Sequence, residues 1–594
     1  MPSLEEYTGP LDKRLRKHLL RRACFQYSKE QLDDLAGKSA AEILDTLIVS
    51  KTYTWEWPYD PITTNNQYGS NRLDGSWLQD PNWTYDKYIN RQVPKRSLVA
   101  GWWWYNALKQ NSIIDKLTWF LFTTFTVSKD DGSGRPGNYF DYLNLLQFYA
   151  DKSVKTLARK ISFDNAMLFY LDNADNEKQS PNENYAREFL ELFTIGKGEQ
   201  VAEGDYTNYT EHDVVQAARV FSGIKINWAR DSHDPDTIKL PHYPNGISKG
   251  WISSSKHDSG NKTFSYAFDN HTINGSSYNS GIENELDDFV DMVFDKIATA
   301  KNYVRKLYRM YVRSEWGQDV EDDIITPLAE QLQANGYNLL EVLRTLLLSK
   351  HFFDLDDSDA TNENVGAMVK NPLQYLNELV TLLGISIPDA TATPPVLYQT
   401  LNNSVEYYNF YRFWYEFCHG SFFPLCGMEF FAPNTVAGYP GDYQSPAYDR
   451  AWFNSNNIVA RYNTINSFIG RNYNDSYGNG VNQIIGVQYA NNGNPWYKRI
   501  WTSFNVLTFF DQNISDPFSA ETIIKELADL LYAEPIDDNR VAYFKLFLVP
   551  EGEPDYYWWQ AWNDWANNGN STQVKNRLEE LLSKMINAAE FQLM

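Results

Sequence analysis

Cysteine and long apolar runs are what this sequence has least of. Its 594 residues include only Cys24, Cys418 and Cys426, too few for a disulfide scaffold and wrongly spaced for a zinc ribbon. Cys418 and Cys426 could form one bridge or be unrelated thiols in an aromatic core. No stretch approaches the roughly 18 consecutive apolar residues of a membrane span, and the first thirty residues lack a signal-peptide core. We therefore expect no transmembrane segment, with the signal peptide absent from this chain.

Positive charge and the common catalytic motifs are scarce as well. Lys and Arg number 53 against 76 Asp and Glu, a net charge of −23 that argues against a nucleic-acid partner. A Walker loop, a G-x-S-x-G elbow and an H-E-x-x-H pair are missing, so these nucleotide, serine-hydrolase and zinc chemistries have no support. Aromatic residues, in contrast, make up 15% of the chain. Together with Asn-rich loops they are common in exported proteins that handle glycans, although large aromatic residues also fill cores.

Apolar residues recur at spacings of three and four along most of the chain, which predicts helices. The segments are 11–24, 29–49, 112–127, 138–159, 211–222, 286–314, 320–350, 365–384, 518–547 and 570–592. No series of alternating strands suggests a sheet core. The predicted fold is mainly α, a large multi-helical domain with long irregular loops and short β-hairpins.

The length exceeds the usual size of one hydrophobic core. We expect either one elaborate helical unit over 1–594 or two lobes, 1–224 and 283–594, joined by the loop-rich segment 225–282. A second long loop covers 432–498. Loops of such length usually carry function or insertions.

The run PNENYAREFLELFTIG, residues 181–196, reads as a capped helix. Ser180 fits the N-cap, Pro181 the first helical position and Glu183 the capping-box glutamate, while Gly196 closes the helix. At about 100° per residue, its polar residues share one face and its apolar residues cover the rest.

The polar face of this run carries three carboxylates, an arginine and an asparagine. These residues are Glu183, Asn184, Arg187, Glu188 and Glu191. One interpretation is a solvated face with an i, i+4 ion-pair ladder. The other is a buried carboxylate cluster held by Arg187 and facing a ligand or a divalent cation. Glu183 and Glu188 are thus candidate catalytic residues, and Asn182 and Arg187 candidate ligand-binding residues.

A second polar group lies in a glycine-containing loop. His257 and Asp258, followed by Lys262, could supply a general acid, a base or metal ligands, and the lysine would favour an anionic ligand. The alternative is an Asx-type turn with exposed side chains. His257 and Asp258 are candidate catalytic residues, and Lys262 is a candidate ligand-binding residue.

Two loop segments add weaker candidates. Residues 432–441 are rich in Pro and Gly, which fix backbone geometry. Within them the Asn434 side chain could hydrogen-bond either a ligand or the backbone of a turn. The Asn- and Asp-rich segment 472–482 could bind calcium or be a flexible turn, and it lacks the order of an EF-hand.

Aromatic residues cluster at 556–565. On a helix, Trp558 and Trp562 share a face with Trp565, so one stripe can pack while Trp559 points elsewhere. Core packing is one interpretation, and an exposed Trp559 that binds a glycan or a protein partner is the other.

Several separated motifs together resemble the DUF1800 family, a large bacterial domain of unknown function, across nearly the whole chain. They are, in order, HLLRRACF, AMLFYLDN, PNENYAREFLELFTIG, YTEHDVVQAARVFSG, KHDSGNKTF, VRKLYRMYV, FFAPNTVAGYPG and AAEFQ. The resemblance implies a compact helical domain, usually exported, with no settled reaction and no known cofactor. Because two of these motifs are polar, we hypothesise that the 183–188 face and the His257 loop converge on one cavity.

The chain departs from the family pattern at one place. Many members resemble FWHNHF where this chain reads FLFTTF, so Phe122 and Thr124 stand in place of two histidines. If those histidines bind metal or transfer protons in relatives, this protein has lost that capacity.

The leading expectation is an extracytoplasmic helical binding or accessory protein, in the periplasm or at the cell surface, that acts in bacterial surface-polymer or secreted-protein handling. Its partner would be a glycan or a protein. One alternative is a hydrolase, with or without a divalent cation, that uses Glu183, Glu188, His257 and Asp258. Another is a structural subunit of a larger surface assembly. The sequence does not determine the oligomeric state.

Overall fold

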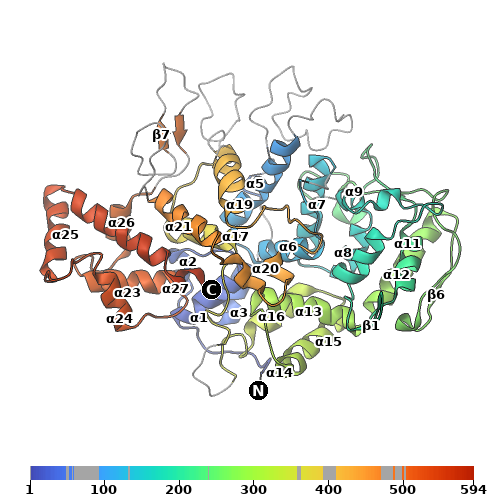
Figure 1. Ribbon diagram of the computed structural model, residues 1–594, viewed down its shortest axis with the longest axis horizontal. Coiled ribbons are helices and arrows are strands. Elements are labelled where there is room, and N and C mark those ends of the chain that lie inside the picture. Colours follow the sequence, from blue (N-terminus) through green and yellow to red (C-terminus); the bar gives the residue numbers. More distant parts are fainter. Residues whose placement is uncertain are drawn as a thin grey trace. The chain divides into compact units, whose positions relative to one another are not determined.

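The computed structural model describes residues 2–48, 53–55, 58, 92–130, 134–238, 240–356, 363–391, 410–411, 413–469, 486–488, 498–500 and 504–594. Within them the chain is mainly helical, and its strands form two-stranded antiparallel sheets (Figure 1). The predicted fold class is therefore confirmed, short hairpins included. In the described part, no helix is long and apolar enough to cross a membrane.

Contacts within the chain divide it into two compact units. The first comprises Met1–Tyr7, Ile48–Asp357 and Glu429–Ser445, and the second comprises Thr8–Leu47, Ser358–Met428 and Pro446–Met594. The loop-rich segment 225–282 lies inside the first unit. The division into lobes 1–224 and 283–594 stays a prediction.

Among the described residues, the first unit contains most of the helices and three of the two-stranded sheets. Its helices are α5 (Gln92–Gln110), α6 (Ile113–Thr124), α7 (Pro136–Tyr149), α8 (Val154–Ile161), α9 (Asn165–Tyr170), η3 (Asn173–Asp175), α10 (Asn184–Glu188), η4 (Phe189–Phe193), α11 (Glu211–Phe221), η5 (Pro235–Thr237), η6 (Tyr266–Phe268), α12 (Asn279–Phe294), α13 (Ile297–Tyr311), α14 (Gln318–Val320), η7 (Glu321–Ile325), α15 (Thr326–Ala334), α16 (Leu339–Leu348) and α20 (Pro440–Tyr443). Its strands are β1 (Gln200–Ala202), β2 (Asp205–Tyr206), β3 (Ile224–Lys225), β4 (Trp251–Ile252), β5 (Lys262–Thr263) and β6 (Thr272–Ile273). They pair as β1–β2, β3–β4 and β5–β6.

Helix α11 shows how local sequence sets an element of this unit. Thr210 and Asp213 form a capping box that satisfies backbone donors at the start of the helix. The Asp213 carboxylate also accepts from the Ser265 backbone N–H at 2.7 Å, which ties the loop after β5 to this helix start. The helix ends at Phe221, and Gly223 follows with a φ of +78° that a non-glycine residue rarely adopts. This turn leads directly into β3.

An aromatic cluster surrounds Phe122, close to Thr124 in the sequence. Phe122 is fully buried, with its ring centroid 4.7 Å from that of Phe431 and 6.4 Å from that of Tyr439. Trp119 stacks on Tyr439 at 5.9 Å with nearly parallel planes. Thr124 is also buried, at 2% exposure. Phe122 and Thr124 are therefore part of the core of the first unit.

The second unit has the same helical character. Its helices are α1 (Lys13–Ala23), α2 (Lys29–Asp34), α3 (Ala40–Leu47), α17 (Pro372–Leu382), η8 (Phe413–Phe422), α19 (Phe423–Leu425), η9 (Tyr448–Trp452), α21 (Asn457–Phe468), α22 (Val506–Asn513), α23 (Ala520–Leu531), α24 (Asp538–Lys545), α25 (Tyr556–Asn568), α26 (Thr572–Ile586) and α27 (Ala589–Gln592), and its strands are β7 (Gly486–Gln488) and β8 (Lys498–Ile500). Helix α21 falls within 432–498, which the sequence suggests is a loop. Cys24, Cys418 and Cys426 are all buried with free thiols, so the bridge does not form.

Buried charges join the helices of the second unit. Glu378 on α17 accepts from Arg21 Nε on α1 at 3.2 Å and lies 2.7 Å from Lys370 Nζ, and all three side chains are fully buried. Burial lowers the pKa of Lys370 to about 7 against the opposing attraction of Glu378. A buried pair of this kind holds its helices in one register, since removing either partner leaves a charge without compensation.

Candidate functional site

The run 181–196 does not begin its helix where the sequence predicts. Residues 181–183 are irregular, and α10 starts at Asn184, whose backbone N–H donates to the Asn182 side chain at 3.0 Å. The predicted cap at Ser180 and capping box at Glu183 are therefore wrong, because Asn182 already satisfies this donor. Gly196 does close the segment, with a φ of +73°.

After α10 the chain continues as the π-helix η4, and α13 holds its end. The carbonyl oxygens of Leu192, Phe193 and Thr194 accept hydrogen bonds from the side chains of Lys306, Tyr303 and Asn302, respectively. A π-turn leaves some carbonyl oxygens without their usual backbone N–H donors, and the α13 side chains supply hydrogen bonds to them instead. Burial lowers the pKa of Lys306 to about 7. Sequence reasoning missed this bulge.

Arg187 pairs mainly outside its own helix. Its guanidinium donates to both carboxylate oxygens of Glu211 on α11, at 2.5 and 2.8 Å, and to Glu183 at 3.3 Å. These side chains are about one third to two fifths exposed. The ion-pair interpretation of the face therefore holds for Glu183 and Arg187, although Glu191 pairs with Lys197.

Glu188 has the most perturbed carboxyl on this face. Burial and then the nearby Glu191 charge raise its pKa to about 7. In the described part of the chain its carboxyl makes no hydrogen bond and no ion pair. The ionisation state of Glu188 would therefore change near neutral pH.

His257 lies in a closed polar cluster. It is 1% exposed, with Nδ1 2.8 Å from the Ser222 carbonyl oxygen and Nε2 3.2 Å from Glu285 Oε2 on α12. The fully buried Lys262 ammonium donates to Glu285 and, at 2.5 Å, to the Asp258 carbonyl oxygen. Both imidazole nitrogens are thus engaged in the core, where a polar group needs partners.

Asp258 faces outward from the same loop and forms the predicted turn. Its carboxylate accepts from Arg219 at 2.9 and 3.2 Å and from the Gly260 backbone N–H at 2.9 Å. The hydrogen bond from Arg219, with that from Gly260, holds the pKa of Asp258 below its usual range. The Asx-turn interpretation is therefore right for Asp258, while His257 and Lys262 are not exposed as it requires.

The predicted groups fall into two separate sets. Within the described residues, no hydrogen bond or ion pair joins the 183–188 face to His257, Asp258 or Lys262. None of these residues lines the 510 Å³ pocket of the first unit, and their shared cavity stays a prediction.

Asn434 is exposed in a bend of the first unit, and its side chain makes no hydrogen bond to a described residue. Trp559, in the second unit, is 39% exposed and stacks on Tyr556 with ring centroids 5.2 Å apart.

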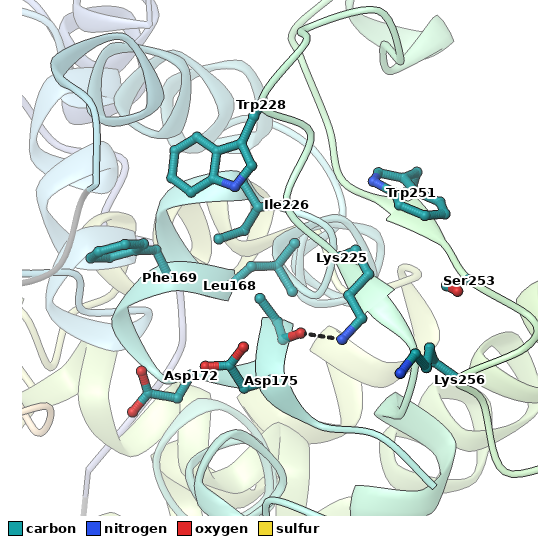
Figure 2. Close-up of a pocket in the computed structure, with 11 residues that line it drawn as sticks. Leu168, Phe169, Asp172, Asp175, Lys225, Ile226, Trp228, Trp251, Ser253 and Lys256 are labelled. Atoms are coloured by element: carbon teal, nitrogen blue, oxygen red, sulfur yellow. Dashed lines mark hydrogen bonds between the residues drawn. The ribbon is translucent and has the colours of Figure 1, made fainter. Parts of the chain in front are cut away.

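A pocket of about 510 Å³ opens elsewhere in the first unit (Figure 2). It is lined by Leu168, Phe169, Asp172, Ala174, Asp175, Lys225, Ile226, Trp228, Trp251, Ser253 and Lys256. These residues come from α9, η3, β3, β4 and the loops around them. The volume lies in the usual range for a ligand site.

Three aromatic side chains stand exposed around this pocket. Phe169, Trp228 and Trp251 are 41%, 40% and 49% exposed. Figure 2 shows Phe169 and Trp228 on one side and Trp251 on the other. Scattered exposed aromatic residues need no explanation, but three around one concave site form an apolar surface that a ligand would cover.

The backbone fixes these rings. Lys225 pairs with Trp251 across the β3–β4 ladder, and their neighbours Ile224 and Ile252 are buried. Alternate residues of a strand point to opposite faces, so burying the two isoleucines turns Lys225 and Trp251 together toward the pocket.

Trp228 is held from two sides. The neighbouring Asn227 N–H donates to Asn165 Oδ1 on α9 at 2.8 Å. Arg135 donates to the Trp228 carbonyl oxygen at 3.0 Å, and its guanidinium lies 4.7 Å from the indole centroid. The Trp228 ring meets Phe169 edge to face, with centroids 6.2 Å apart.

The two lysines of the pocket share one carboxylate. Lys225 Nζ donates to Glu177 Oε1 and Lys256 Nζ to Glu177 Oε2, each at 2.7 Å. Lys225 also donates to the Ala174 carbonyl oxygen at 2.5 Å, the interaction dashed in Figure 2. Hydrogen bonds from Lys225 and Lys256 hold the pKa of Glu177 below its usual range.

Sequence reasoning did not select these lining residues as a site, although signals for them exist. Phe169 and Asp172 lie in the motif AMLFYLDN, and Lys256 begins the motif KHDSGNKTF. Lys225, Trp228 and Trp251 belong to 225–282, the segment expected to carry function or insertions. Which aromatic residues of these segments are exposed depends on the pairing of β3 with β4, which the sequence does not display.

The divalent cation considered from the sequence stays a prediction. Among the residues that the structure describes, no group of three or more His, Cys, Asp or Glu side chains could hold a metal ion. The candidate calcium segment 472–482 lies outside the described residues.

Comparison with known proteins places the chain in one family. The family model described as "Protein of unknown function (DUF1800)" matches residues 18–593, and the chain belongs to this family. The comparison with curated proteins and the comparison with solved structures each gave no match.

Proposed function

We propose that this protein is an extracytoplasmic binding or accessory protein that recognises a glycan through the pocket in Figure 2, in bacterial surface-polymer handling. The observation that carries the proposal is the set of three exposed rings, Phe169, Trp228 and Trp251, around one concave site. A sugar ring has apolar C–H faces that can lie against aromatic faces, and hydroxyl groups that need polar partners. The pocket offers both kinds of group.

The site is also pre-organised. Strand pairing orients Trp251, and the contacts of Arg135 and Asn165 hold the loop that carries Trp228. A ligand therefore meets rings that need little ordering, which lowers the entropic cost of binding.

The hydrolase alternative has less support. His257, its proposed acid or base, is 1% exposed and has both ring nitrogens in hydrogen bonds. A proton-transfer group needs reach to a substrate. We therefore infer a structural role for His257.

A glycan array tests the proposal. The full chain is applied to immobilised bacterial and plant glycans, alongside the double variant Trp228→Ala/Trp251→Ala. The matched control is Tyr266→Ala/Tyr278→Ala, which removes two rings of the same unit that are 62% and 64% exposed. Surface substitutions of this kind usually change stability little, and thermal unfolding verifies that the variants fold.

The wild-type chain should bind at least one glycan, and the control variant should bind it equally well. In the Trp228/Trp251 variant the affinity should fall about tenfold or more, which corresponds to a loss of about 1.4 kcal/mol of binding free energy. Trp559→Ala, in the second unit, should leave this binding unchanged. Binding to no glycan, or equal binding by the Trp228/Trp251 variant, would overturn the proposal.

A further inference from the structure

The charges that line the pocket are not balanced equally. Lys225 and Lys256 are both satisfied by Glu177. In the described part of the chain, the carboxylates of Asp172 and Asp175 make no hydrogen bond and no ion pair, and both residues are exposed. The lining groups left for a ligand to pair with are therefore acidic.

The two carboxylates are held on the same side of one turn. Asp172 has a φ of +55° and precedes the 3-10 helix η3, and the Asp175 N–H donates to the Asp172 carbonyl oxygen at 3.0 Å. Figure 2 shows both side chains on the same side of the pocket, next to Leu168 and Phe169.

Buried asparagines fix this turn to the rest of the first unit. Asn173 donates to the Phe221 carbonyl oxygen at 3.4 Å, and Asn176 donates to the Ala218 carbonyl oxygen at 2.8 Å, both on α11. The Asn182 side chain donates to the Asp172 carbonyl oxygen at 3.3 Å. These hydrogen bonds hold the backbone of the turn, so both aspartates stay at the edge of the pocket.

We propose that the glycan bound in this pocket carries free amino groups, and that Asp172 and Asp175 receive its ammonium. The inference rests on the proposed function and assigns the ligand class. An ammonium pairs with a carboxylate through charge-assisted hydrogen bonds, and the aromatic rings of the pocket attract the same charge where a ring face lies within about 6 Å of it. An N-acetylated or purely hydroxylated sugar offers the same ring faces without this charge.

The aromatic rings favour an organic cation over a bare metal ion. A hard metal ion takes several oxygen ligands and gains little from an indole face, whereas an ammonium on a sugar ring presents charge and apolar surface together. The net charge of −23 adds a long-range attraction for a cationic polymer at low salt.

Three tetrasaccharides with the same β-1,4 backbone isolate the amino group. The probes are glucosamine tetramer, N-acetylglucosamine tetramer and cellotetraose, titrated into the full chain by isothermal calorimetry at low salt. The test variant is Asp172→Asn/Asp175→Asn. The matched control, Glu203→Gln/Asp323→Asn, removes the same charge from two exposed positions of the first unit outside the pocket.

The expected result is a Kd for the glucosamine tetramer at least about tenfold lower than for the other two probes. In Asp172→Asn/Asp175→Asn this preference should disappear, whereas the control should keep it. Raising the salt concentration should weaken the binding of the glucosamine tetramer more than that of the other two probes, since its additional affinity comes from charge.

The remaining outcomes separate the two proposals. Equal binding of all three probes, with loss only in Trp228→Ala/Trp251→Ala, would overturn the amino-sugar inference and keep the glycan site. Binding to no glycan here or on the array would overturn both. Tighter binding of tetralysine than of the glucosamine tetramer would assign the pocket to a peptide and also overturn the inference.

Discussion

Replacing Glu285 by glutamine tests whether the His257 cluster stabilises the fold. Glu285 is 2% exposed and accepts hydrogen bonds from His257 Nε2, Lys262 Nζ and the Ser276 backbone N–H. Burial raises the pKa of Glu285, but the hydrogen bonds from His257 and Lys262 outweigh it, so the pKa lies below its usual range. Glutamine keeps the shape and one acceptor oxygen, removes the charge, and replaces the second acceptor oxygen by a donor.

The expected cost follows from the lysine left behind. Breaking a buried pair by removing one partner typically costs about 3–5 kcal/mol. Without Glu285, Lys262 can lose its proton and stay buried as a neutral amine. Deprotonation at neutral pH costs roughly 5 kcal/mol, which is about 1.4 kcal/mol for each pH unit below the ordinary pKa of 10.5. Burial already lowers the pKa of Lys262, so the true cost lies below this ceiling. We expect Glu285→Gln to destabilise the first unit by about 3–4 kcal/mol.

Hydrogen exchange read by mass spectrometry is the suitable assay, because a chain of two units need not unfold in one step. Peptides covering 253–285 should lose protection, while peptides of α23 and α26 in the second unit should not. The double variant Lys262→Met/Glu285→Gln should recover at least half of the loss, since it removes the uncompensated charge. Unchanged protection in Glu285→Gln, to within about 1 kcal/mol, would refute the structural role given to His257 and Lys262.

Three further predictions concern single residues. Glu188→Gln should raise the Tm near pH ~8 and leave it unchanged near pH ~4. The pKa of Glu188 is about 7 in the folded state against 4.5 ordinarily, so the folded state keeps a proton that the unfolded state releases, and wild-type stability falls as the pH rises from 4.5 through 7. An equal shift of the Tm at both pH values in thermal scans would contradict this. Gly223→Ala should lower the unfolding free energy of the first unit by about 1–3 kcal/mol or more, because φ is +78° and a Cβ would meet the His257 backbone nitrogen at 2.8 Å. A urea titration in which the unfolding midpoint does not shift would count against this prediction. Trp558→Ala should cost about 3–5 kcal/mol, since the ring is 0% exposed, whereas Trp559→Ala should cost less than about 1 kcal/mol; similar calorimetric losses for both would show that the face assignment of α25 is wrong.

Local sequence signals predicted the elements whose causes are local. The spacing of apolar residues predicted a helix over 211–222, and α11 covers Glu211–Phe221 behind a capping box of Thr210 and Asp213. In the tryptophan stripe of α25, Trp558 and Trp562 are buried and Trp565 is half-buried, while Trp559 is exposed. Capping and periodicity depend on residues three or four positions apart, which a sequence displays directly.

Features that depend on distant partners could not be predicted in this way. His257 lies in a polar loop but is buried, because its partner Glu285 is 28 residues away on α12. Trp251 faces the pocket because β4 pairs with β3 across a long insertion. The π-helix after α10 depends on donors from α13 more than a hundred residues away. None of these pairings leaves a periodic trace in the sequence.

A crystal structure of the full chain with its best-binding glycan would test the central claim most directly. We predict electron density for sugar rings against Trp228 and Trp251, with Phe169 beside them and any amino group within hydrogen-bond distance of Asp172 or Asp175. A glycan bound elsewhere, for example on Trp559 with this pocket holding only solvent, would contradict the account.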